Sequence, residues 1–350
     1  MFSKNEIKLF KTACEINGVS GIENKVAKFL KDEYTKLGYQ LIFDNLGSIY
    51  AYKKSKNPNA IKIMVDGHMD EIGFLVVSIE NTGLIKLAPL GGLYIETLHA
   101  QRVLLTKRNG DTIEGAIDCS NLSNTNIKNV KADFGFANKD EAISNGVNIG
   151  DMVVVKGDLV VLNGGKRLMA KAFDDRYGIV LGLELAKRMK DKELPYDLYI
   201  GGSVQEEVGL RGAKTSSNLI DPDFAICLDC SPSNSLKGEC GNLGDGVLLR
   251  YYDRSMIAFE ELISLQEKAV KKAHVKSQYF YSMGGTNAGS VHMNDDGVLT
   301  LTHCICARNL HTNSTIIDSD DYHAAKKSLF KLLDLIDEKE IEKIRQWRRS

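Results

Sequence analysis

Hydrophobic residues in the first seventy positions recur first with a helical period and then with the pattern of strands. Ile7, Phe10 and Cys14 fall on one side of a helix. Residues 22–38 continue this spacing up to Gly38, a residue type that commonly ends helices. Short runs rich in β-branched and aromatic residues follow at 40–44, 48–53 and 61–70. The pattern therefore predicts two helices followed by three strands.

The pattern changes between about Ile72 and Asn163, where short apolar runs are separated by glycine-rich turns. A single brief helical signal, at Lys139–Ser144, interrupts them. The apolar runs lie at 72–80, 84–90, 102–107, 111–117 and 151–162. Closely spaced short strands of this kind are typical of small barrels. We therefore predict an inserted, barrel-like, all-β domain over residues 72–163.

Long amphipathic segments alternate with apolar strands again after residue 163. We expect helices at 176–190, 259–273 and 320–339, and strands at 197–204, 224–229 and 299–305. Such alternation is typical of an α/β sheet covered by helices. Neither flank of the insertion has enough strands for a good sheet alone. Residues 1–71 and 164–350 are therefore predicted to form one α/β domain with a mixed sheet and helices on both faces.

The composition of the chain argues against some classes of function. The chain has 45 basic and 46 acidic residues among its 350, so it has no overall field that would hold nucleic acid or an anionic membrane. A peptide or another small molecule is the expected substrate. Charged residues interrupt the apolar N-terminus, which argues against a signal peptide, and no window is long enough to span a membrane. We expect a cytoplasmic protein.

The cysteines indicate a reduced protein without a disulfide framework. There are seven of them, an odd number scattered over a long chain. Cys227 and Cys230 form a C-x-x-C pair, but no second pair follows at the spacing of a zinc ribbon. Because the pair lies inside an apolar run, we interpret both residues as buried strand positions.

Residues that commonly bind metals follow three of the predicted strands. His68 and Asp70 end the first, the adjacent pair Glu206 and Glu207 follows the second, and Asp229 ends the third. In an open α/β sheet, ligands bind in the crevice at the carboxyl ends of the strands. Each residue alone also has a structural explanation, such as a satisfied histidine or a turn cap. Their recurrence at the same kind of position predicts one shared site.

Two further candidates lie outside these strands. Asp174 precedes a predicted helix together with Asp175, where the pair could equally serve as a helix cap. His311 follows another apolar stretch. Together with the strand-end residues they make a mixed nitrogen and oxygen ligand set, which suits zinc, manganese or cobalt.

The number of carboxylates predicts two divalent cations that share one carboxylate ligand, because so many anions would not lie together without counter-charge. Such a centre gives the adjacent acidic pair two different roles. Glu207 would be a ligand, while Glu206 would act as the base toward a water. Asp70 would accept a hydrogen bond from the His68 imidazole and fix its tautomer.

Five stretches, in order and spacing, resemble the M42 family of metallo-aminopeptidases, which includes the tetrahedral TET peptidases and the glutamyl aminopeptidases. They are DGHMDEIGF, KAFDDRYG, VQEEVGLRGA, CLDCSP and the closing GGTNAGSVH with CARNLHTNS. The resemblance extends over essentially the whole chain. It implies an aminopeptidase acting on short peptides, with an α/β domain carrying a PDZ-like or barrel-like insertion. It also implies a homo-oligomer, of which the tetrahedral dodecamer is the large form.

The resemblance also implies a role for each candidate residue. His68 and Asp229 would hold one metal, Glu207 and His311 the other, and Asp174 would bridge the two through a turn whose Asp174–Asp175 peptide bond is cis. Glu206 would be the general base. Zinc is the expected metal, with cobalt and manganese as alternatives.

Some stretches depart from the family pattern. Residues 91–97 and 118–124 differ from the segments usual at these places, and Asn287 stands where many relatives have Asp, a change that we expect to affect substrate preference. Three other functions stay open. They are a related dinuclear deacylase or carboxypeptidase, an endoglucanase, and a non-catalytic protein of the same fold.

Overall fold

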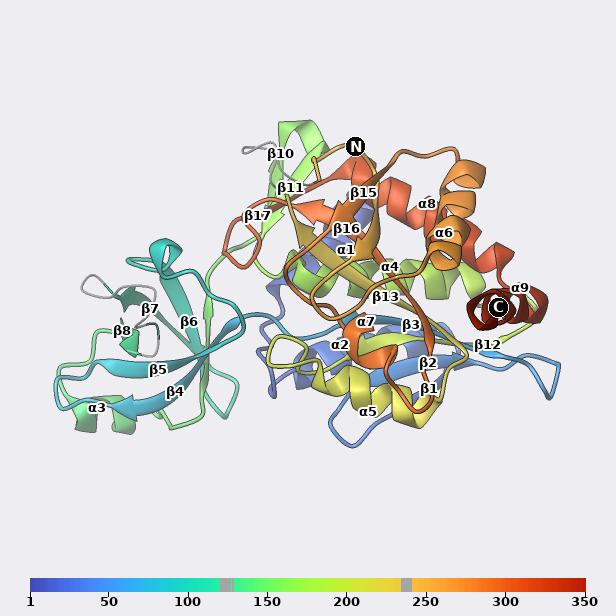
Figure 1. The fold of residues 1–350 in the computed structure, drawn as a ribbon. Helices are drawn as coiled ribbons and strands as arrows, with labels where there is room; N and C mark the ends of the chain where they lie inside the picture. Colours follow the sequence, from blue (N-terminus) through green and yellow to red (C-terminus); the bar gives the residue numbers. More distant parts are fainter. Residues whose placement is uncertain (120–126, 128, 234–240) are drawn as a thin grey trace.

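The computed structural model describes residues 1–119, 127, 129–233 and 241–350. Within these residues the chain forms an α/β domain and a β-barrel that lies to one side of it (Figure 1). The two parts have separate hydrophobic cores. The predicted boundaries of the insertion, residues 72 and 163, remain a prediction. No helix of the described residues is both long enough and apolar enough to cross a membrane.

An eight-stranded mixed sheet forms the centre of the α/β domain, which confirms the predicted fold class. Four of its central strands run parallel to one another, while the outer pairings include antiparallel ones. In order across the sheet, the strands are β1 (Gln40–Phe43), β2 (Ile49–Lys53), β12 (Asp197–Ser203), β3 (Lys62–His68), β13 (Phe224–Pro232), β16 (Leu299–Ala307), β14 (Val247–Tyr252) and β15 (Ser277–Tyr281).

Helices cover both faces of this sheet (Figure 1). They are α1 (Lys4–Glu15), α2 (Asn24–Lys36), α4 (Phe173–Met189), α5 (Arg211–Ile220), α6 (Glu260–Ala273), α7 (Ala288–Val291), α8 (Ser319–Leu335) and α9 (Glu338–Arg349). Most follow from apolar periodicity, as in α1, where Phe10 and Cys14 are buried and Ser3 caps the first turn through a hydrogen bond from the N–H of Glu6.

Two neighbouring residues of β3 show how the faces are covered. A Cβ atom on Gly67 would lie 3.0 Å from the carbonyl carbon of Gly178 in α4, so glycine permits this close approach. The side chain of the preceding Asp66 accepts a hydrogen bond from Asn287 at 2.8 Å, at the start of α7. Because successive strand residues point to opposite faces, α4 lies on one face and α7, with its neighbour α5, on the other.

The barrel is closed by six antiparallel strands, which agrees with the predicted barrel-like fold. Around the barrel they are β4 (Gly73–Ile79), β5 (Ile85–Leu90), β8 (Lys131–Asp133), β7 (Thr112–Asp118), β6 (Arg102–Thr106) and β9 (Met152–Val155). Phe74, Val103 and Val153 are buried in its core. The short elements η1 (Ile95–Thr97) and α3 (Lys139–Ser144) belong to the same stretch of chain.

A small three-stranded sheet lies outside both larger ones. It consists of β10 (Val160–Leu162), β11 (Arg167–Ala170) and β17 (Thr315–Asp318), with the turn η3 (Asn163–Gly165) between the first two. The run at 151–162 is therefore divided, since β9 joins the barrel and β10 pairs with β11.

The predicted final helix over 320–339 is wrong in its last part. Helix α8 ends at Leu335 and α9 begins at Glu338. Between them Asp337 adopts an extended backbone and accepts the N–H of Glu340 at 2.8 Å, so it caps a new helix. The interpretation of Cys227 and Cys230 is confirmed, because both are buried in β13.

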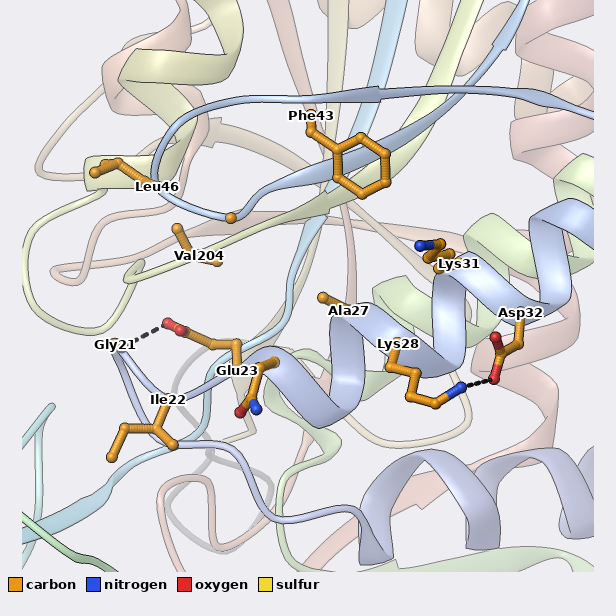
Figure 2. Close-up of a pocket in the computed structure, with 12 residues that line it drawn as sticks. Gly21, Ile22, Glu23, Ala27, Lys28, Lys31, Asp32, Phe43, Leu46 and Val204 are labelled. Carbon is orange, nitrogen blue, oxygen red and sulfur yellow. Dashed lines mark hydrogen bonds and ion pairs between the residues drawn. The ribbon is translucent and has the colours of Figure 1, made fainter. Parts of the chain in front are cut away.

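A surface cavity of about 710 Å³ opens where the start of α2 faces the turn between β1 and β2 (Figure 2). Its lining is largely apolar and includes Ile22, Ala27, Phe43, Leu46 and Val204. The carboxylate of Glu23 also borders this cavity.

Candidate active site

The carboxyl ends of three parallel strands bring the predicted site residues together. His68 is the last residue of β3, Glu206 and Glu207 follow β12, and Asp229 lies in the second half of β13. Because parallel strands end at the same edge of a sheet, these side chains converge. A cavity of about 870 Å³ opens at this edge.

Asp174 lies between two histidines. Its Oδ1 atom is 3.0 Å from Nε2 of His68, and its Oδ2 atom is 3.2 Å from Nε2 of His311. Asp174 is in the first turn of α4, and His311 lies in the connection from β16 to β17. The peptide bond between Asp174 and Asp175 is cis, as the resemblance implies. One carboxylate that faces two imidazoles in this way has the arrangement of a bridging ligand.

Three groups of side chains in the described residues could hold a metal ion. Within each group the potential ligand atoms lie within 4.8 Å of one another. The groups are His68–Asp174–Asp229, Asp174–Glu207–His311 and His68–Glu206–Glu207. The first two share Asp174 and contain the same residues as the two metal sites implied by the family resemblance.

The charges of this cluster fit divalent cations. Burial and the neighbouring Glu207 and Asp174 raise the pKa of Glu206 to about 8. Burial and Asp174 raise the pKa of Glu207 to about 7, and its buried Oε1 atom has no hydrogen-bond partner in the described part of the chain. Burial, Asp174 and Asp175 raise the pKa of Asp229 well above its usual range. The neighbouring imidazoles of His68 and His311 lower these pKa values, but they outweigh neither burial nor the repulsion between the carboxylates.

The pKa of His311 shows the same excess of negative charge. Burial favours the neutral imidazole of His311, but the carboxylates of Glu207 and Asp174 raise its pKa to about 10. The cluster thus attracts a positive charge, which a proton supplies in the absence of a metal. Imidazole nitrogen and carboxylate oxygen are ligands suited to zinc, cobalt and manganese. The residues present fit a metal centre.

Both histidines are oriented through their second ring nitrogen. Nδ1 of His68 is 3.1 Å from the backbone oxygen of Asp70 and 3.4 Å from its Oδ1 atom. Nδ1 of His311 is 2.7 Å from the backbone oxygen of Gly92. Because each Nδ1 faces an acceptor, Nε2 is left as the ligand atom toward Asp174.

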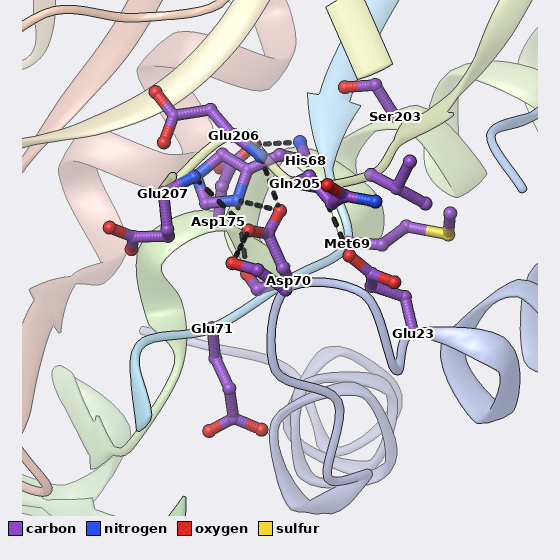
Figure 3. A network of polar contacts seen from close by, with 12 residues as sticks. Glu23, His68, Met69, Asp70, Glu71, Asp175, Ser203, Gln205, Glu206 and Glu207 are labelled. Atoms are coloured by element: carbon purple, nitrogen blue, oxygen red, sulfur yellow. Dashed lines mark hydrogen bonds and ion pairs between the residues drawn. The ribbon is translucent and has the colours of Figure 1, made fainter. Parts of the chain in front are cut away.

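Sequence reasoning missed Gly92 and the structural role of Asp175. Gly92 lies in the unusual segment 91–97, and a backbone carbonyl leaves no signal in the residue type. Asp175 accepts the N–H groups of His68 at 3.1 Å and Gly178 at 2.8 Å, and so links the first turn of α4 to the end of β3 (Figure 3). In the sequence, only the adjacent acidic pair at 174–175 could have indicated this role of Asp175.

Asn287 is not among the residues that line the cavity, and its expected effect on substrate preference stays a prediction. It is 2 % exposed, and its Nδ2 atom donates to Asp66 and Ser203 within the core. The neutral amide therefore links two buried side chains. The other unusual segment, 118–124, lies mostly outside the described residues.

Residues 47–327 match the sequence profile of the family described as M42 glutamyl aminopeptidase. The chain belongs to the M42 peptidase family. This M42 peptidase is 36% identical over 348 residues to the glutamyl aminopeptidase of Lactococcus lactis subsp. cremoris (strain MG1363). The alignment covers 96% of this chain and 98% of that relative.

Two solved structures share the M42 peptidase's fold. A TET aminopeptidase from the marine sediment archaeon Thaumarchaeota archaeon SCGC AB-539-E09 superposes with a TM-score of 0.91 at 32% identity, covering 97% of this chain and 99% of the other. The Pyrococcus horikoshii TET1 peptidase, which can assemble into a tetrahedron or a large octahedral shell, superposes at 0.84 with 27% identity, covering 94% and 99%. The chain is accordingly a peptidase of the hydrolase class with the mixed α/β fold of the TET peptidases.

Proposed function

We propose that this M42 peptidase is a dinuclear, metal-dependent aminopeptidase that removes N-terminal residues from short peptides. The observation that carries the proposal is the position of Asp174 between His68 and His311, shared by two groups of three potential ligands. His68, Asp174 and Asp229 would hold one ion, and Asp174, Glu207 and His311 the other. Zinc is the expected metal, with cobalt and manganese as alternatives.

Two divalent ions bound by these residues would polarise the scissile carbonyl and make an attacking water more acidic. Glu206 lines the cavity and does not belong to either of the two ligand groups that share Asp174. We propose that it accepts the proton of the water and passes that proton to the leaving amine. Asp70, behind His68, keeps the imidazole in one orientation.

Carboxylates also explain why cleavage would start from the N-terminus. Glu206, Glu207 and Asp229 all line the cavity. These negative charges would attract the free α-ammonium group of a substrate. An internal amide carries no charge and would not be attracted in this way. We propose that this contact holds the peptide with its first bond at the site.

Arginines in the cavity lining would favour an acidic first residue. Arg250 and Arg254 both line the cavity. Arg250 is buried and already paired with Asp253 at 3.0 Å. Arg254 is exposed and forms no ion pair with the residues that the structure describes. We propose that Arg254 binds the side-chain carboxylate of an N-terminal Glu or Asp, the preference that the name of the Lactococcus relative carries.

A panel of aminoacyl-p-nitroanilides, assayed after chelation and again with zinc, cobalt or manganese, tests this function. We expect activity that disappears with the chelator, returns with metal and is highest for the glutamyl and aspartyl substrates. Hydrolysis of N-acyl amino acids without any release of p-nitroaniline would favour the deacylase alternative. Glucan hydrolysis that persists in chelator would favour a glycosidase, because paired carboxylates need no metal for that reaction.

We also propose that the protein is a homo-oligomer, supported by the tetrahedral and octahedral assemblies of its P. horikoshii relative. Light scattering coupled to size-exclusion chromatography would measure the assembly directly. A mass of a single 38.7 kDa chain at working concentration would contradict this proposal.

A further inference from the structure

The chain that carries Glu206 and Glu207 leaves the sheet when β12 ends at Ser203. The next four backbone N–H groups have side-chain acceptors in place of strand partners. Figure 3 shows Gln205, Glu206 and Glu207 with their acceptors Glu23 and Asp70. The N–H of Val204 donates to Oγ of Ser48 at 3.3 Å, and the N–H of Gln205 donates to Oε1 of Glu23 at 3.0 Å. The N–H groups of Glu206 and Glu207 donate to Oδ1 and Oδ2 of Asp70, at 3.0 and 3.2 Å. Three segments distant in sequence thus hold this loop.

The backbone conformation of Gln205 depends on such a contact. Its φ of 56° lies in the left-handed region, which is unfavourable for a residue with a side chain. Such a conformation persists where the surroundings hold it. The direction of the Glu206 side chain follows directly from this backbone, since Gln205 is the residue before it.

Glu23 accepts the N–H of Gln205. It lies just before α2, is 5 % exposed, and its Oε1 atom also accepts the N–H of Gly21 at 2.7 Å. It belongs to none of the groups that could hold a metal ion. Figure 2 shows its carboxylate beside Gly21, at the edge of the 710 Å³ cavity that Val204 also lines.

We propose that Glu23 is a positioning residue for Glu206. Its carboxylate holds the N–H of Gln205 and thereby the left-handed turn that directs the general base into the active-site cavity. The inference rests on the proposed function for the role of Glu206, while the contact itself is independent of it. Asp70 holds the following two N–H groups, so Glu23 and Asp70 together secure three consecutive amides.

Two substitutions separate this role from general stability. Glu23→Ala removes the acceptor, and water from the adjacent cavity replaces it only in part, so we expect kcat to fall about tenfold at unchanged KM. Glu23→Gln keeps an acceptor oxygen of the same reach and should retain most of the activity. Lys28→Ala is the matched control, because Lys28 in α2 lines the same cavity but pairs with Asp32 at the surface.

The decisive readout is amide hydrogen exchange of residues 203–208 in the metal-free protein, measured by mass spectrometry beside the kinetics. We expect faster exchange at Gln205 and Glu206 in Glu23→Ala and wild-type exchange in the Gln and Lys28 variants. Unchanged exchange in Glu23→Ala overturns the inference, whatever the activity. Faster exchange with wild-type kcat also overturns it, since the loop would then not set the base.

Failure of the proposed function would be visible separately. A wild-type protein without aminopeptidase activity would refute that function, while the exchange data would still decide whether Glu23 holds the loop. If Glu23→Ala does not fold, Glu23→Asp, which withdraws the carboxylate by one methylene, gives the same two readouts.

Discussion

Nδ1 of His311 lies 2.7 Å from the backbone oxygen of Gly92, in the connection between β5 and β6 of the barrel. A potential metal ligand of the α/β domain is therefore oriented by the stretch of chain that forms the barrel. The same stretch contributes Tyr94 to the cavity lining. This stretch of chain thus takes part in building the site.

Replacement of the proposed base should separate chemistry from metal binding. Glu206→Gln keeps the size of the side chain but cannot accept a proton from water, so kcat should fall at least 100-fold. Because two ligand groups are complete without Glu206, the bound metal should stay at the wild-type level. Stopped assays with glutamyl-p-nitroanilide and elemental analysis measure the two quantities. Substantial turnover in this variant would exclude Glu206 as the base.

Removal of one histidine ligand should reduce the metal content. His311→Ala takes a nitrogen ligand from one of the two groups that share Asp174, and we expect about half the bound metal after dialysis together with loss of activity. His292→Ala is the control, since its Nδ1 is 2.8 Å from the backbone oxygen of Ala288, away from these groups. A wild-type metal content in His311→Ala would contradict the proposed ligand set.

The preferred first residue should depend on Arg254. A charge-assisted hydrogen bond to a carboxylate is worth about 1.5–3 kcal/mol, so Arg254→Ala should lower kcat/KM for glutamyl-p-nitroanilide about 10- to 100-fold. The alanyl substrate has no side-chain charge and serves as the control within the same variant. Equal losses for both substrates would mean that Arg254 acts on something other than the substrate side chain.

Acid stability should depend on Glu6. Burial alone would raise its pKa, but hydrogen bonds from Lys326, Ser3 and His323 outweigh burial and lower the pKa from its usual 4.5 to about 2. A carboxylate with a lowered pKa in the folded state stabilises above the unfolded value, and this contribution is lost as pH falls from about 4.5 to about 2. Because Glu6 is partly screened by solvent, we expect about 1 kcal/mol.

Urea unfolding of Glu6→Gln at pH 7 and pH 3 would measure this contribution. The variant should be less stable than the wild type at pH 7 and should approach it at pH 3. Glu33→Gln, which removes an exposed pair with Lys36, is the control. An equal difference between Glu6→Gln and wild type at both pH values would mean that packing, and not charge, accounts for the effect.

Periodicity in the sequence predicted the elements that matter most for the site. Strands β3, β12 and β13 and helix α4 are continuous runs, and burial of one whole face or of both faces makes their apolar spacing regular. Edge strand β15 was missed because Tyr279 and Tyr281 are exposed on it, so that no buried row marks it as a strand. The break between α8 and α9 was missed because the pattern of apolar and polar residues continues from one helix into the next. Only the capping role of Asp337 marks the start of the second helix.

The sequence by itself determined which side chains could perform the chemistry of this M42 peptidase. Imidazoles and carboxylates at the ends of parallel strands are themselves the chemical signal, and sheet topology brings strand ends together. Only the tertiary structure decided which backbone groups hold them, such as the carbonyl of Gly92 and the N–H of Gln205. Every residue carries a carbonyl, and nearly every residue an N–H, so their roles depend on which distant segment packs beside them.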